Sequence, residues 1–208
     1  MRKTDIIIRN ETPNDFSAVE HLTREAFWNV YRPGCTEHYI LHCFRNDPAF
    51  VPELDLVLGQ AGRLVGHILY VHAFIETDDG QCLPILTFGP LSIDPAHQKQ
   101  GLGKLLVNTS LEKAAALGFG AVAITGNLEF YRHSGFVMGK SRNIRYADDP
   151  EADYFLVKEL APGFLHGVSG VFHDPEGYFV AESDPAGFEA FDAQFPHREK
   201  QKLPGQLG

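Results

Sequence analysis

The chain of 208 residues is 44% hydrophobic and 22% charged, and this apolar content excludes a disordered protein and favours one well-packed domain. A formal net charge of −9 at pH 7 leaves no basic field for nucleic acid or an anionic membrane, so we expect neither as a partner. Three cysteines without a regular spacing indicate reduced thiols, and no apolar run is long enough for a signal peptide or a membrane span, so we expect a cytoplasmic protein.

The first half of the chain is predicted to form a strand, two helices and then three strands. Apolar residues alternate in the predicted strands and recur every three or four positions in the predicted helices. In chain order these elements are Ile6–Arg9, Thr12–Phe27, Thr36–Phe44, Leu54–Gln60, Leu64–Glu76 and Leu83–Ile93. Asp78-Asp79-Gly80 supplies the turn between the last two, and Gly89-Pro90 interrupts the final strand because proline has no N–H to donate to a sheet.

The second half begins with the strongest helix signal of the sequence. Residues Gly101–Leu117 carry an amphipathic pattern that ends at Gly118, a typical residue after a helix. A buried strand, a short helix and two strands are predicted to follow, at Ala121–Thr125, Asn127–His133, Arg142–Tyr146 and Tyr154–Leu160. The element order predicts a mixed α/β fold.

The composition changes near residue 160, which predicts a domain over residues 1–160 and a C-terminal extension over residues 161–208. Glycine and proline make up 12 of the last 48 residues but only 21 of the first 160. The extension is nevertheless rich in aromatic residues, so we expect it to pack against the domain or against a second subunit, the latter giving a homodimer. These residues are Phe164, Phe172, Tyr178, Phe179, Phe188, Phe191 and Phe195.

The segment Gln98–Lys104 lies between a predicted long strand and the amphipathic helix, where a phosphate group can bind. Its two glycines let the backbone approach a ligand, and the first turn of a helix has unpaired N–H groups at the positive end of the helix dipole. We predict that a pyrophosphate binds there, with charge-assisted contacts from Lys99 and Lys104. The alternative interpretation is a plain turn followed by a helix cap.

Two other phosphate-binding motifs are excluded by the same segment. A Walker loop requires a glycine where Gln98 stands and a Ser or Thr where Leu105 stands. A Rossmann loop requires a third glycine at the position of Leu106.

Four stretches in order resemble the acetyl-CoA-binding core of GNAT N-acetyltransferases. They are Pro90-Leu91-Ser92-Ile93-Asp94-Pro95, Gln98-x-x-Gly101-x-Gly103, Leu117-Gly118-Phe119 and Tyr131-x-x-x-Gly135-Phe136. The resemblance covers residues 6–160 in element order, is most specific over residues 88–136, and is strongest to a bacterial group of predicted N-acetyltransferases. It implies the GNAT fold, with a twisted, mostly antiparallel sheet flanked by helices, and acetyl-CoA as co-substrate.

The resemblance also implies roles for the residues that match the family motif. The Leu91 N–H is expected to donate to the thioester carbonyl, and Tyr131 to protonate the departing thiolate, unless Tyr131 is only a core aromatic. Phe130 is expected in the core, and Asn127 either caps the short helix or contacts the cofactor. The remaining predicted cofactor-binding residues are Ser92 and Ile93 for pantetheine and Gln98, Lys99, Gln100, Gly101, Leu102, Gly103 and Lys104 for the pyrophosphate.

The general base and the acceptor-binding residues are less well defined. Many family members place a glutamate on the strand before the loop, but Leu83–Ile93 has none, so His72, Glu76 and ordered water are the candidates. The family resemblance implies that the region between the first two helices lines the acceptor pocket, which suggests Tyr31, His38 and His42. Cys35, His38, His42 and Cys43 lack the paired spacing of a structural zinc site, so we expect no metal.

The predicted activity is transfer of an acetyl group from acetyl-CoA to a primary amine, on a small molecule or a peptide. The amine is expected to attack the thioester directly, without a metal or an acyl-enzyme. The alternatives are transfer of a longer acyl group, and a non-catalytic module that binds acyl-CoA for regulation.

Overall fold

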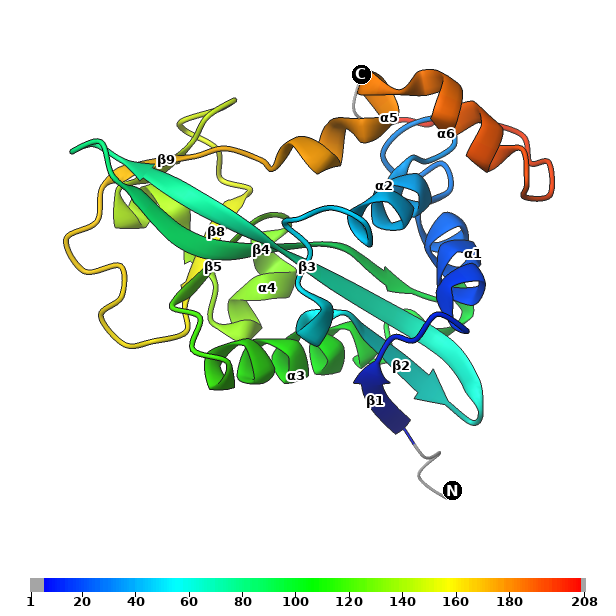
Figure 1. Ribbon diagram of the computed structural model, residues 1–208, viewed down its shortest axis with the longest axis horizontal. Coiled ribbons are helices and arrows are strands. Elements are labelled where there is room, and N and C mark those ends of the chain that lie inside the picture. The colour runs from blue at the N-terminus through cyan, green and yellow to red at the C-terminus, as the bar shows by residue number, and fades with distance from the viewer. Residues whose placement is uncertain (1–5, 207–208) are drawn as a thin grey trace. The chain divides into compact units, whose positions relative to one another are not determined.

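Nine strands form one sheet within residues 6–206, the range that this computed structural model describes. The strand order is β1-β2-β3-β4-β5-β8-β6, and β9 pairs with β3 and β7 (Figure 1). The β4–β5 and β7–β9 pairs are parallel, whereas β1–β2, β2–β3, β3–β9, β5–β8 and β6–β8 are antiparallel. The strands are β1 (Ile6–Asn10), β2 (Leu56–Gln60), β3 (Arg63–Thr77), β4 (Cys82–Ile93), β5 (Ala121–Thr125), β6 (Val137–Met138), β7 (Ile144–Tyr146), β8 (Phe155–Glu159) and β9 (Gly170–Phe172).

The helices complete the mixed α/β fold with a mostly antiparallel sheet, as predicted. They are α1 (Phe16–Phe27), α2 (Glu37–Phe44), α3 (Leu102–Ala116), α4 (Leu128–Tyr131), α5 (Val180–Ser183) and α6 (Pro185–Asp192), with short 3-10 turns η1 (Pro52–Leu54), η2 (Pro95–His97), η3 (Arg132–Ser134), η4 (Gly139–Arg142) and η5 (Glu176–Phe179). None of the helices among residues 6–206 is long and apolar enough to cross a membrane.

Helix α1 begins later than the sequence pattern predicts. The side chain of Asp15 accepts hydrogen bonds from the N–H and the hydroxyl of Thr12, at 2.9 and 2.7 Å. Residues 12–15 therefore form a turn, and the helix starts at Phe16.

The chain divides into two compact units. The first consists of Met1–Leu69, Gly89–Leu106 and Glu176–Gly208, and the second of Tyr70–Phe88 and Val107–Pro175. Strands β3 and β4 and helix α3 each contribute residues to both units. The predicted C-terminal extension is thus divided, since residues 161–175 belong to the second unit and the rest to the first.

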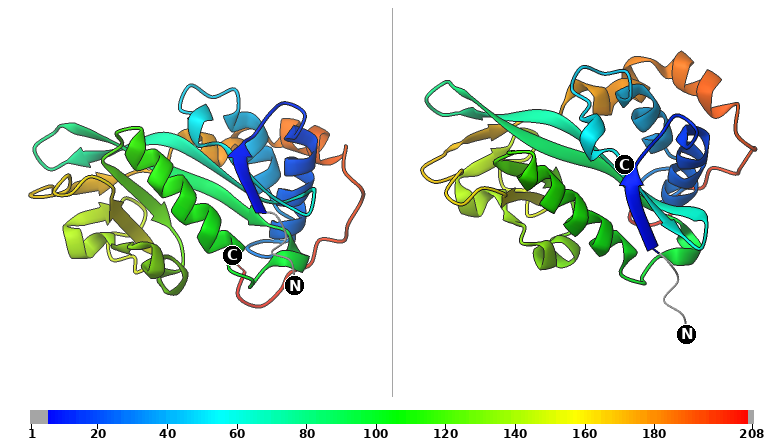
Figure 2. Two further views of the ribbon diagram at one scale, coloured as in Figure 1. Left: turned by 90° about the horizontal axis from the view of Figure 1, so that it is seen from below. Right: turned by 60° about the horizontal axis from the view of Figure 1, so that its bottom comes forward.

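In the first unit, the segment from Glu176 onward packs on the N-terminal helices. Helices α5 and α6 lie beside α2 (Figure 2). Tyr39, Ala181 and Phe191 form a buried cluster, and the Tyr39 hydroxyl donates to Asp184 at 3.0 Å. Arg24 in α1 donates to Asp192 at 2.8 Å. These aromatic residues of the extension therefore pack against the chain's own helices.

The first unit also contains a buried charged network beneath α2. His67 lies 2.7 Å from Asp55, and Arg45 donates two hydrogen bonds to Glu11 at 2.7 and 2.9 Å. Burial lowers the pKa of His67 to about 4 and raises the pKa of Glu11 to about 7. The imidazole is therefore neutral at pH 7 and donates to Asp55 rather than adding a second buried cation.

In the second unit, aromatic residues from three strands form the core. Phe155 in β8 stacks on Phe172 in β9 with ring centroids 5.2 Å apart, and Tyr146 in β7 stacks on Phe155 at 5.5 Å. Gly139 leaves room for this stack, because a Cβ there would collide with the Phe155 ring. Phe172 of the predicted extension is therefore a core residue of this unit.

Candidate active site

The predicted phosphate-binding segment forms the entry to helix α3 in the first unit. Residues 98–101 make the turn after η2, and Gly101 has a φ of +83°, which favours glycine. The first helical hydrogen bond there runs from the Leu105 N–H to the Gly101 carbonyl, at 3.0 Å. The N–H groups of Leu102, Gly103 and Lys104 precede this bond, so none of them has a partner further back within the helix.

The side chains of the segment divide into two kinds. Gln98 donates to the Ile93 carbonyl at 3.1 Å, and Gln100 donates to the Ala96 carbonyl at 3.2 Å, so both amides brace the turn itself. Lys99 and Lys104 are exposed. The two lysines are therefore the side chains of this segment that could meet a phosphate, beside the N–H groups at the start of the helix.

The end of β4 carries the predicted thioester and pantetheine contacts in the same unit. Ser92 is buried, and its hydroxyl lies 2.8 Å from the hydroxyl of Thr23 in α1. Side chains alternate along a strand, so Leu91 and Ile93 face away from α1. Ser92 can therefore contact pantetheine only through its backbone. Gly89, two residues before Leu91, has a φ of +150°, which side chains rarely adopt.

Tyr131 lies at the end of α4 in the second unit, among aromatic rings. Its ring centroid is 5.8 Å from Phe88 and 5.6 Å from Phe136. Gly126 admits this ring, because a Cβ there would lie 2.6 Å from the Tyr131 ring. Phe130 is 42% exposed, so the prediction that it is the core residue of the pair was wrong, and the missing side chain at Gly126 is the reason.

Asn127 caps helix α4. Its side-chain oxygen accepts a hydrogen bond from the Glu129 N–H at 2.8 Å, so the predicted capping role is confirmed.

Tyr70 is a buried polar residue near Tyr131 that the sequence analysis missed. Its hydroxyl lies 2.8 Å from the Ser110 hydroxyl, and its ring centroid is 5.0 Å from Phe88. Burial raises the pKa of Tyr70, and its electrostatic interaction with Tyr131 acts in the same direction. The alternation that places His72 and Glu76 on one strand face also includes Tyr70, so this pattern could have identified it.

The two candidate bases are both exposed side chains of β3 in the second unit. The His72 ring packs on Phe119 with centroids 5.7 Å apart. Glu76 lies 3.8 Å from His173. Both side chains are open to solvent.

The three predicted acceptor contacts have different surroundings. Tyr31 is exposed. His42 pairs with Glu20 at 2.9 Å. His38 is completely buried, with its imidazole 3.0 Å from Asp192 and 3.5 Å from the Cys35 sulfur. The prediction that His38 contacts the substrate was therefore wrong, because the extension covers this residue.

One group among residues 6–206 has a spacing that could hold a metal ion. Glu11, Asp55 and His67 each offer one ligand atom within 4.8 Å of the others. Arg45 already donates two hydrogen bonds to Glu11, so a cation would have to compete with the guanidinium. This arrangement fits an internal ion pair better than a metal site.

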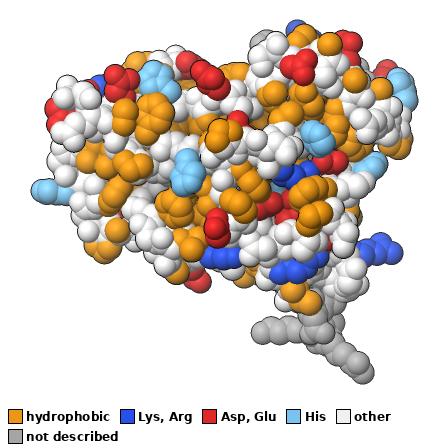
Figure 3. Space-filling view, in the orientation of Figure 1, with side chains coloured by type: hydrophobic (Ala, Val, Ile, Leu, Met, Phe, Trp, Pro, Cys, Tyr) orange, Lys and Arg blue, Asp and Glu red, His pale blue; other side chains and the backbone are white. Residues whose placement is uncertain are grey.

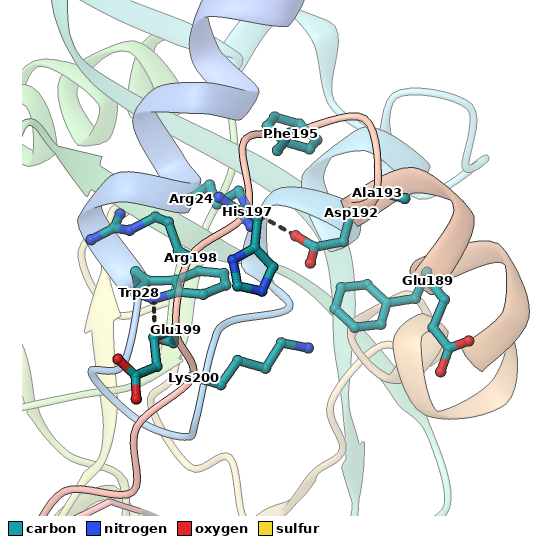
Figure 4. Close-up of a pocket in the computed structure, with 11 residues that line it drawn as sticks. Arg24, Trp28, Glu189, Asp192, Ala193, Phe195, His197, Arg198, Glu199 and Lys200 are labelled. Carbon is teal, nitrogen blue, oxygen red and sulfur yellow. Dashed lines mark hydrogen bonds and ion pairs between the residues drawn. The ribbon is translucent and has the colours of Figure 1, made fainter.

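A cavity of about 590 Å³ lies between α1 and the extension in the first unit (Figure 4). Trp28 and Phe188 supply apolar walls, and the Trp28 indole donates to the Glu199 carbonyl at 3.1 Å. Two of its charged lining residues, Arg24 and Asp192, form an ion pair. None of the predicted cofactor residues lines this cavity.

Charge on the face drawn in Figure 3 is mixed rather than of one sign. Figure 3 shows small groups of acidic, basic and hydrophobic side chains on the face that it draws. Lys99 and Lys104 at the start of α3 therefore stay the predicted anion-binding side chains.

Known proteins resemble this chain in both sequence and structure. The sequence model of the acetyltransferase (GNAT) family matches residues 17–136. The uncharacterized N-acetyltransferase YjhQ of Escherichia coli (strain K12) is 32% identical over 91 residues, which are 43% of this chain and 49% of that protein. The chain thus spans about half the length of this curated relative.

Two crystal structures share the fold over most of the chain. The GNAT family N-acetyltransferase YhbS from Escherichia coli, in complex with CoA, has a TM-score of 0.74 and 25% identity, covering 86% of this chain and 94% of its own. A GNAT family acetyltransferase from Brucella melitensis, in complex with acetyl-CoA, has a TM-score of 0.67 and 24% identity, covering 84% and 99%. Because the family match extends over more than half of its residues, this chain belongs to the acetyltransferase (GNAT) family.

Proposed function

We propose that this protein transfers an acetyl group from acetyl-CoA to a primary amine. The observation that carries the proposal is the start of α3, where N–H groups without a partner further back in the helix accompany the turn at Gly101 and two exposed lysines. This is the environment that a diphosphate requires. The CoA and acetyl-CoA complexes of two structural relatives support the same ligand here.

The backbone of the first unit would hold and polarise the thioester. The N–H groups of Gln98–Lys104 bind the diphosphate, and the pantetheine arm follows the end of β4 through the backbone of Ser92 and Ile93. The Leu91 N–H donates to the thioester oxygen as it gains negative charge. Loss of one such donor typically costs about 2.7–4 kcal/mol of transition-state stabilisation.

Tyr131 would act as the general acid. The amine nitrogen forms a bond to the acetyl carbon, the carbon–sulfur bond breaks, and the departing thiolate takes a proton from the phenol. The aromatic surroundings of Phe88 and Phe136 fix the ring, which holds the hydroxyl in one place for this transfer.

The amine must lose a proton before it attacks. An alkylammonium with a pKa of about 10.4 is neutral in only about one molecule in a few thousand at pH 7. His72, Glu76 and ordered water are the proposed acceptors of this proton. The substrate that receives the acetyl group is an amine of a small molecule or a peptide.

We further propose a cytoplasmic location in a bacterium. The named relatives described above are bacterial proteins, and Cys35, Cys43 and Cys82 are free thiols.

The proposal is tested by measuring CoA release with polyamines, amino acids, aminoglycosides and peptides, comparing the wild type with Tyr131→Phe. We expect kcat of Tyr131→Phe to fall by about 10²–10⁴-fold, because a general acid typically contributes that much, while the Kd for acetyl-CoA stays nearly constant. Tyr154→Phe is the matched control, since Tyr154 is an exposed tyrosine of the same unit.

An unchanged kcat in Tyr131→Phe would remove this residue as the acid. Tight binding of acetyl-CoA without CoA release with any amine would favour the non-catalytic, regulatory alternative. Turnover only with longer acyl-CoA esters would identify the protein as an acyltransferase of different chain length.

A further inference from the structure

The C-terminal segment reaches the strand that carries the proposed thioester donor. The Tyr178 hydroxyl, on turn η5, donates a hydrogen bond to the Gly89 carbonyl at 3.2 Å. Gly89 precedes Leu91 by two residues in β4, and a Cβ there would lie 3.6 Å from the Tyr178 hydroxyl. A residue far from the cofactor motifs in sequence thus contacts the backbone just before Leu91.

Tyr178 is held in this position by close packing on helix α2. Its ring meets the Phe44 ring edge-on, with centroids 4.9 Å apart. Gly177 lets the turn approach, because a Cβ at that position would collide with the Phe44 ring. Asp184, six residues further along, accepts a hydrogen bond from the Tyr39 hydroxyl. The phenol therefore comes from an anchored turn rather than from a loose tail.

A second hydroxyl holds the strand on the other side of Leu91. The Thr23 hydroxyl of α1 lies 2.8 Å from the Ser92 hydroxyl, and both side chains are buried. Leu91 is thus bracketed by a contact to the Gly89 carbonyl and a contact to the Ser92 side chain. Two separate parts of the first unit constrain the same four residues of β4.

We propose that Tyr178 is a positioning residue for acetyl transfer, which it serves by fixing the Gly89 carbonyl and so the direction of the Leu91 N–H. This inference rests on the proposed function, in which the Leu91 N–H donates to the thioester oxygen. Hydrogen bonds weaken steeply when the donor is misaligned, so a small rotation of this backbone reduces the polarisation of the carbonyl. Tyr178 itself need not touch the substrate.

The test combines turnover with a direct measurement of the bound thioester. Acetyl-CoA labelled with ¹³C at the thioester carbonyl is bound to the wild type, Tyr178→Phe and Thr23→Val, and the carbonyl stretching frequency is recorded by isotope-edited infrared spectroscopy. A hydrogen bond to the carbonyl oxygen lowers this frequency. We expect both variants to show a higher frequency than the wild type and kcat to fall about three- to tenfold, the effect of one hydrogen bond.

Tyr154→Phe is the control, because it removes a phenol hydrogen bond, to Asp149, from an exposed tyrosine of the second unit. It should retain the wild-type frequency and kcat. Thermal unfolding of each variant separates this effect from a loss of folding, and Thr23→Val provides an independent measurement if Tyr178→Phe is destabilised.

A Tyr178→Phe protein with the wild-type carbonyl frequency would overturn the inference. A wild type that binds acetyl-CoA without releasing CoA with any amine would instead refute the proposed function. In that case the infrared comparison would still decide whether Tyr178 orients the Leu91 N–H. The two failures are therefore distinguishable.

Discussion

Two ion pairs join the N-terminal helices to the C-terminal segment, and their burial predicts very different effects on stability. Arg24 and Asp192 lie 2.8 Å apart, with side chains only 4% and 16% exposed. Arg32 and Glu182 lie 2.9 Å apart but are 43% and 51% exposed. The separation is nearly the same, so the pairs differ mainly in burial, and Asp192 has a further contact with the buried His38.

The substitution Asp192→Ala should be much more destabilising than Glu182→Ala. Removing Asp192 leaves the buried Arg24 guanidinium without its counterion, which typically costs about 3–5 kcal/mol, and the partial exposure of Asp192 favours the lower end. Removing Glu182 breaks an exposed pair, a change of at most about 1 kcal/mol. For a chain of this size, about 3 kcal/mol corresponds to a fall in Tm of about 6–12 °C.

The assay is urea denaturation and thermal unfolding at pH 7, in low and high salt. The loss in Asp192→Ala should persist in high salt, whereas any effect of Glu182→Ala should shrink, because salt screens exposed charges. The double variant Arg24→Met/Asp192→Leu should recover most of the stability, since no unpaired charge stays buried. Equal, small losses in the two single variants would refute the argument from burial.

Two further predictions concern acid stability and the surroundings of Tyr131. Burial lowers the pKa of His38 and of His67 to about 4, from about 6.5 in an unfolded chain, although Asp192 opposes the shift at His38. Each histidine therefore stabilises the fold fully above pH ~6.5 and progressively less as the pH falls towards 4, so the free energy of unfolding should decrease with falling pH. The substitution His67→Gln should reduce the slope of this pH dependence by up to about 1.4 kcal/mol per pH unit, measured by urea denaturation. An unchanged pH dependence of the free energy of unfolding in His67→Gln would contradict the lowered pKa of His67. Gly126→Ala should displace the Tyr131 ring, which its Cβ would approach to 2.6 Å, and lower kcat about ten- to hundredfold without a matching loss of Tm. A variant with wild-type kcat would show that the ring position is unimportant.

Local patterns predicted most of the secondary structure because the relevant signals lie within each segment. The helix α3 was placed to within one residue at each end by its apolar spacing and by Gly118. Strand β5 was predicted with its observed bounds. Strand β9 was missed because its three residues carry no periodicity, and only its pairing with β3 and β7 defines it. Helix α6 was hidden in a segment whose glycines and prolines indicated irregular structure.

The candidate site was predictable only where its chemistry is local in sequence. The turn before α3 was located from two glycines and the start of a helix. The contact of Tyr178 with Gly89 spans 89 residues, and that of Thr23 with Ser92 spans 69, so no spacing within a segment could reveal either. His38 was misassigned for the same reason, because its burial depends on Asp192, which lies 154 residues away.

The division of the chain between its two units affects how it can fold during synthesis. Arg24 leaves the ribosome 168 residues before Asp192, a delay of roughly 8–34 s at about 5–20 residues per second. The first unit cannot close until the segment from Glu176 onward has been made, whereas all residues of the second unit precede that segment in the chain. The part of helices α1 and α2 that packs on this segment therefore stays uncovered until the segment has been made.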